Sequence, residues 1–155
     1  MAISSDTVIE FFGTQDIVTN ATGTLALASS AFASTAAVVN WVNDDDAPEA
    51  AFYFRGDFGT APAPGGALYL YARLMAIGPN SSDMTIPSTT NKQRLIAVFQ
   101  PSTVASTQVH VARAFLPNMK ASQTYQFLLE NQTSQSVSST YEIYITPLTK
   151  GPAGP

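Results

Sequence analysis

Few residues of this 155-residue chain could do nucleophilic or acid–base chemistry. The chain has one histidine, His110, and no cysteine. Acyl transfer needs a nucleophile, a base and a group that orients the base, yet no serine lies in a G-x-S-x-G nucleophile elbow. His110 stands between Val109 and Val111 in an alternating apolar segment, where a packing or surface role is commoner than catalysis. We therefore predict no catalytic residues.

The one run of carboxylates is Asp44-Asp45-Asp46, followed by Glu49. Carboxylate oxygens can bind Ca²⁺, but the run lacks the D-x-[DN]-x-[DN]-G frame of a calcium loop and its closing glutamate. Asn and Asp are also favoured turn residues, so a solvated turn between Trp41 and Pro48 is the preferred interpretation. A zinc site needs at least three ligands, and we predict no metal and no cofactor.

Two further carboxylates, Asp57 and Glu130, lie in strand-like segments. Glycoside hydrolysis uses a carboxylate pair about 5 to 10 Å apart, but nothing in the sequence places these two together. No P-loop or G-x-G-x-x-G phosphate cradle occurs either. The expectation is a protein without enzyme activity.

The chain that carries these residues has few charged side chains. Charged residues make up 12% of it, about half the share usual in soluble domains, with a net charge of −4 and an apolar fraction of 45%. Disorder is disfavoured because the apolar residues can form a core. The seven basic residues are scattered, which argues against nucleic acid. No apolar run reaches the about 18 residues of a membrane helix, and no export signal is apparent, so we expect a protein that is made and used without export.

Apolar residues alternate with period two from about residue 50 onward, as is typical of strands. The expected strands are 24–28, 35–42, 50–58, 67–77, 94–100, 107–115, 124–131 and 138–147. Turn signals separate them, and no helix longer than two turns is expected. The sequence therefore predicts an all-β fold: an antiparallel β-sandwich of about eight strands, jelly-roll-like, with an extended N-terminal arm.

Three parts are expected: an arm over 1–20, the sandwich over 21–148, and a Gly/Pro-rich tail over 149–155. Ile9, Phe11 and Phe12 are apolar, early and outside the clear strand pattern, which makes them candidates for contact with another protein or subunit. The alternative, that they add an edge strand to the core, is equally open.

Five aromatic residues allow two interpretations: Trp41, Tyr53, Tyr69, Tyr71 and Tyr144. They could form a sugar-stacking platform on one sheet. They could instead fill the core or a subunit interface, where amphipathic rings are favoured. The second interpretation is preferred.

The order of segments from Phe52 to Leu148 resembles a family of tailed-bacteriophage virion structural proteins, those of the head decoration (capsid cement) type. The segments are an aromatic strand with a Gly/Ala/Pro turn (58–62), a strand at 67–72, a polar loop at 78–91, a strand at 95–99, a Thr/Ala spacer at 102–107, the segment 125–133 and a closing strand at 141–148. Ser134 stands where relatives tend to have Gly.

This resemblance implies a jelly-roll-like structural protein of the virion, located on the capsid exterior. Its partners would be the major capsid protein and further copies of itself in a homotrimer, with Ile9, Phe11 and Phe12 as capsid or subunit contacts. Such a protein would stabilise the head through repeated weak contacts. The alternative is a carbohydrate- or receptor-binding module of a phage tail or fibre, which would use an aromatic face or the 78–91 loop.

Overall fold

The computed structural model describes residues 8–20, 26–33, 37–77, 83–92 and 94–152. Over these residues the chain forms ten β-strands and no α-helix, and therefore no helix that could cross a membrane. The strands are β1 (Val8–Phe12), β2 (Asp16–Asn20), β3 (Ala31–Phe32), β4 (Trp41–Asn43), β5 (Glu49–Asp57), β6 (Ala67–Met75), β7 (Leu95–Phe99), β8 (Thr107–Phe115), β9 (Gln123–Gln132) and β10 (Glu142–Pro152). The predicted all-β fold is confirmed.

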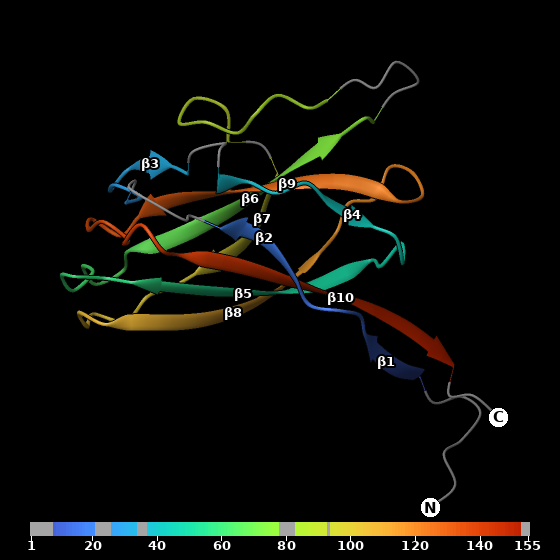
Figure 1. Ribbon diagram of the computed structural model, residues 1–155, viewed down its shortest axis with the longest axis horizontal. Helices are drawn as coiled ribbons and strands as arrows, with labels where there is room; N and C mark the ends of the chain where they lie inside the picture. Colours follow the sequence, from blue (N-terminus) through green and yellow to red (C-terminus); the bar gives the residue numbers. More distant parts are fainter. Residues whose placement is uncertain (1–7, 21–25, 34–36, 78–82, 93, 153–155) are drawn as a thin grey trace, which may run out of the picture.

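The strands form two antiparallel sheets that pack as two layers (Figure 1). The first sheet has the order β1-β10-β5-β8, with β2 also paired to β10; the second has the order β3-β9-β6-β7, with β4 also paired to β9. The predicted antiparallel sandwich is thus confirmed, with ten strands in place of about eight.

Alternating side chains build the core between the two layers. Phe52 and Phe54 of β5 point inward and are fully buried, as are Leu68 and Leu70 of β6. Phe52 packs edge-on against Phe127 of β9, with ring centroids 5.1 Å apart. The burial of these large apolar side chains is the main force that holds the two sheets together.

The N-terminal residues form strands, as the edge-strand alternative for Ile9, Phe11 and Phe12 allowed, and do not form the preferred extended arm. Over residues 8–20 an arm is not seen, because β1 and β2 pair with successive parts of β10. Residues 1–7 of the expected arm lie outside the described residues. Of the strand expected at 24–28 only residues 26–28 are described, and Leu27 makes an isolated bridge to Val137; of the strand expected at 35–42, residues 41–42 belong to β4.

Residues 149–152, the described part of the expected Gly/Pro-rich tail, belong to a strand. Lys150, Gly151 and Pro152 form the end of β10 and pair with β1. The absence of a side chain at Gly151 leaves room for the ring of Phe11, which would lie 3.3 Å from an added Cβ. Pro152 ends the strand, where the missing N–H costs little. Residues 153–155 lie outside the described residues.

Gly66 is a position at which the fold requires a glycine, because a Cβ there would lie 2.8 Å from the Cα of Thr133. We predict that Gly66→Ala lowers the free energy of unfolding by about 1–3 kcal/mol, since a rigid backbone cannot move aside cheaply. Gly59→Ala is the matched control: no atom lies within 4 Å of the added Cβ, and its effect should stay within about 0.5 kcal/mol. Urea unfolding measures both, and equal effects would contradict the packing.

Candidate functional site

The clearest candidate for contact with another molecule is a two-stranded ribbon at the end of the first sheet. β10 pairs with β5 only as far as Leu148, and from there to Pro152 it pairs with β1. We call Val8–Phe12 with Leu148–Pro152 the terminal ribbon. It extends away from the two layers near both chain ends (Figure 1). Two-stranded ribbons alone are marginally stable in water, so this one gains from packing against something else.

The three predicted contact residues all lie in this ribbon. Phe11 and Phe12 are neighbours in β1, so their side chains point to opposite faces; they are 49% and 68% exposed. Ile9 pairs with Gly151. These residues belong to an edge strand, as one alternative expected. Phe11 and Phe12 are nevertheless exposed, so they remain available for contact with another molecule, as the other alternative expected.

A network of ion pairs joins the ribbon to the rest of the first sheet. The Arg113 guanidinium of β8 contacts the carboxylates of Glu10 in β1 and Glu49 in β5, the latter at 2.9 Å. Lys150 Nζ of β10 lies 2.8 Å from Glu49. The hydrogen bond from Lys150, together with that from Arg113, lowers the pKa of Glu49. Partly exposed ion pairs contribute little stability each, but these four side chains link four strands, the two strands of the ribbon among them.

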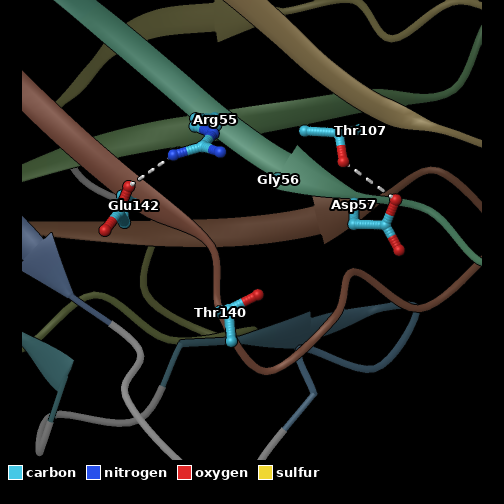
Figure 2. A pocket seen from close by; sticks show the side chains of 6 residues that line it. All are labelled: Arg55, Gly56, Asp57, Thr107, Thr140 and Glu142. Atoms are coloured by element: carbon cyan, nitrogen blue, oxygen red, sulfur yellow. Dashed lines mark hydrogen bonds and ion pairs between the residues drawn. The ribbon is translucent and has the colours of Figure 1, made fainter.

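A shallow polar pocket lies at the opposite end of the first sheet. It measures about 200 Å³ and is lined by Arg55, Gly56, Asp57, Thr107, Thr140 and Glu142. Its charged groups already have partners (Figure 2): the Arg55 guanidinium lies 3.7 Å from Glu142, and the Thr107 hydroxyl donates to Asp57 over 3.2 Å.

Asp57 and Glu130, weighed above as a carboxylate pair, are not brought together. Asp57 belongs to the first sheet and Glu130 to the second. Glu130 is fully buried and accepts hydrogen bonds from Lys92 Nζ at 2.6 Å, the Tyr71 hydroxyl at 3.0 Å and Gln132 at 2.8 Å. Burial raises the pKa of this carboxyl, but these hydrogen bonds outweigh it and the pKa is lowered. Burial and the nearby carboxylate raise the pKa of Tyr71 to about 12.

The lone histidine has a packing role. His110 stacks on Phe54 with ring centroids 6.3 Å apart, and its Nε2 lies 3.1 Å from Gln108 Oε1. Partial burial lowers the pKa of His110. These contacts explain its position without a chemical role.

The acidic run is a turn, as predicted. Asp44, Asp45 and Asp46 are exposed, and Asp46 Oδ1 accepts a hydrogen bond from the Ser122 amide at 2.7 Å. The turn is held by the buried Asn43, whose side chain bonds both backbone groups of Ala47. Within the described ranges no group of three or more His, Cys, Asp or Glu side chains could hold a metal ion.

The five aromatic residues do not form one platform. Trp41 and Tyr71 are buried in the second sheet, where Trp41 donates to Asp16 at 3.0 Å. Tyr69 also belongs to that sheet and is half-buried. Only Tyr53 and Tyr144 lie side by side, on the first sheet, with ring centroids 5.9 Å apart.

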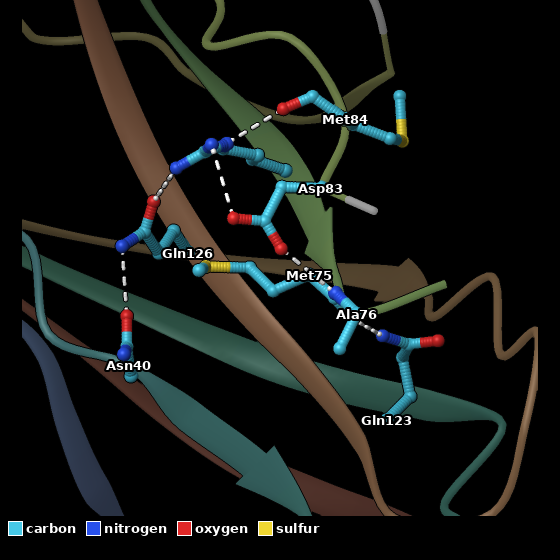
Figure 3. Close-up of polar contacts among 8 residues, drawn as sticks. Asn40, Met75, Ala76, Asp83, Met84, Gln123 and Gln126 are labelled. Atoms are coloured by element: carbon cyan, nitrogen blue, oxygen red, sulfur yellow. Dashed lines mark hydrogen bonds and ion pairs between the residues drawn. The ribbon is translucent and has the colours of Figure 1, made fainter. Parts of the chain in front are cut away.

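A polar cluster that the sequence analysis did not predict lies on the second sheet around Arg73, whose partners Asp83, Met84 and Gln126 are labelled in Figure 3. Its guanidinium donates to the Met84 carbonyl and to Gln126 Oε1, both at 2.7 Å, and lies 3.5 Å from Asp83. Asp83 also accepts the Ala76 amide at 2.9 Å. These contacts hold the described part of the β6–β7 connection against the sheet. Arg73 occupies an ordinary outward position of an alternating strand, so only the fold reveals its partners.

No protein-family model matches this chain, and no curated protein sequence matches it.

The buried Glu130 carboxylate generates a stability prediction. Lys92→Met leaves it without its cation and should cost about 2 kcal/mol, because uncompensated buried charge is strongly unfavourable. The double variant Lys92→Met/Glu130→Gln removes that charge as well and should be more stable than Lys92→Met alone. Urea unfolding of both variants at pH 7 tests this, and a double variant that is less stable than Lys92→Met would contradict it.

The same pair should give a characteristic pH dependence. Because the pKa of Glu130 is lowered, its carboxylate adds to the free energy of unfolding at pH values above the ordinary pKa of glutamate. This contribution is lost as the pH falls through the lowered pKa. The stability difference between wild type and Lys92→Met should therefore shrink between about pH 7 and pH 3. A difference that is constant over this range would show that Lys92 acts through packing only.

Proposed function

We propose that this chain is a non-enzymatic capsid decoration protein, which binds the outside of a tailed-phage head as a homotrimer and stabilises it through contacts with the major capsid protein. The observation that carries the proposal is the terminal ribbon, with Phe11 and Phe12 exposed on its two faces.

The ribbon has the physical properties of a docking element. Its side chains gain about 25 cal/mol for each Å² of apolar surface they bury. Phe11 and Phe12 point to opposite faces, so the ribbon can be covered from two sides, as in a crevice between two capsid subunits. In the described part of the chain no strand pairs with the outer edge of β1, and a free strand edge can also accept a strand from a partner.

The non-enzymatic part of the proposal is supported by what the chemically capable side chains do. His110 stacks on Phe54, Glu130 forms a buried ion pair with Lys92, and Asp57 accepts a hydrogen bond from Thr107. Each has a structural partner. The order of segments from Phe52 to Leu148, which resembles the decoration proteins, supports the location on the capsid exterior and the trimeric assembly.

The proposal predicts that apolar contacts of the ribbon carry the binding. Phe11→Ser/Phe12→Ser should weaken binding to expanded capsids assembled without this protein by at least about tenfold, since loss of two aromatic anchors typically costs more than about 1.4 kcal/mol. Co-sedimentation over a range of protein concentrations measures the affinity.

The matched control is Val104→Ser, which removes an exposed apolar side chain from the loop at the opposite end of the first sheet. It should bind as the wild type does. Unchanged binding of the double-Phe variant would contradict a role of the ribbon. A folded wild-type chain that ignores capsids but binds host glycans on an array would favour the receptor-binding alternative instead.

A further inference from the structure

The solvent-facing side of the first sheet carries a second exposed surface, distinct from the terminal ribbon. In β5 the buried residues alternate with outward ones, so that Tyr53 and Arg55 point away from the core. The register places Val111 of β8, Tyr53 of β5 and Tyr144 of β10 in one row across three strands. We call the outward side chains of β8, β5 and β10 the outer face.

Exposed apolar side chains lie at the centre of the outer face and along its β8 side. Val111 is 68% and Phe115 75% exposed, and Val109 is also exposed. Tyr53 and Tyr144 pack edge to face beside Val111. Aromatic side chains such as Tyr53, Tyr144 and Phe115 are enriched in protein interfaces.

Charged side chains lie on both sides of this apolar row. Arg55 pairs with Glu142 on one side, and Arg113, Glu49, Glu10 and Lys150 form the network on the other. Of the outward charged side chains of β8, β5 and β10, three are basic (Arg55, Arg113 and Lys150) and three are acidic (Glu49, Asp57 and Glu142), in a chain whose net charge is −4. The outer face is therefore balanced in charge, and two copies of it do not repel each other.

β8 is also an edge strand. It pairs with β5 over its whole length, and among the described residues no strand pairs with its other edge. Long apolar edge strands favour association, and most proteins protect them with charged residues or cover them. Arg113 is the one Lys, Arg, Asp or Glu in β8, and it is already engaged with two carboxylates.

We propose that the outer face binds a second copy of this chain, with Val111 near the centre of the contact and Phe115 at its margin, where β8 ends. The inference rests on the proposed assembly of copies and adds a second kind of contact to it. A contact between two outer faces is isologous and joins copies in pairs, so it would link copies of neighbouring trimers and would not close a trimer. Both signs of charge on one face suit a self-contact, because basic groups of one copy can meet acidic groups of the next.

The size of the face suits a weak contact between proteins. Three strands of about nine residues give a flat area of about 30 by 15 Å, roughly half of the 800 Å² that each partner buries in a standard interface. A saccharide would use the Tyr53–Tyr144 pair and the adjacent pocket but would leave Val111 and Phe115 in solvent. A second copy of the chain that lies across the face would cover all four of these side chains.

The test is the association of the full chain in solution. Sedimentation equilibrium between about 1 and 100 µM, where interfaces of this size dissociate, should show oligomers for the wild type. Val111→Lys places a charge in the apolar row and should weaken association by at least about tenfold. Val42→Lys is the matched control, since Val42 is an exposed valine in a strand of the second sheet; it should associate normally.

A second measurement does not depend on a disruptive substitution. The chain has no cysteine, so Val111→Cys and Val42→Cys each introduce a single thiol in place of a side chain of similar size. The thiol at position 111 should react with a maleimide at least about tenfold more slowly at high protein concentration than after dilution, because a copy covers it. The thiol at position 42 should react at the same rate at both concentrations.

Three results would overturn the inference: a wild type that stays monomeric throughout, a Val111→Lys variant that associates as the wild type does, or a thiol at 111 that is equally reactive at both concentrations. Monomeric protein whose Tyr53 is required for saccharide binding would assign the outer face to a glycan.

Capsid binding is measured separately. If Phe11→Ser/Phe12→Ser loses the capsid but still forms oligomers, the two surfaces are independent.

Discussion

The first sheet depends on β10 being paired along both of its edges. β5 lies on one side as far as Leu148, and β2 followed by β1 lies on the other. This pairing satisfies the backbone groups of the strand, while Ile143 and Ile145 complete the core from the same strand. Because β10 continues beyond the end of its pairing with β5, its last residues and β1 form the terminal ribbon. The ribbon is thus a direct consequence of the strand lengths.

The ribbon and the outer face belong to the same sheet, and one ion network lies where they meet. Glu10 belongs to the ribbon, whereas Glu49 and Arg113 belong to the outer face. The ion pairs therefore link the ribbon to the outer face. The charged side chains of this sheet are largely paired with one another, whereas apolar side chains such as Phe12, Val111 and Phe115 are exposed.

The sequence predicted those parts of the fold that depend on local alternation. The bounds of β5, β8 and β9 agree within one or two residues because side chains such as Phe52 and Phe54 alternate strictly with polar ones. The end of β10 could not be predicted, since a Gly-Pro segment has low strand propensity and its partner β1 is distant in sequence. Phe11 and Phe12 could be singled out because they are apolar residues outside the clear strand pattern. Lys92 could not be predicted as the partner of Glu130, because it lies in a polar connection without periodicity.

Cryo-electron microscopy of a capsid decorated with this chain would show both proposed contacts in one map. We expect density for the sandwich on the capsid exterior, with Phe11 and Phe12 of the ribbon against the capsid shell and the outer face against a neighbouring copy. A sandwich attached to the capsid through another surface, with the ribbon and Val111 both in solvent, would contradict this expectation.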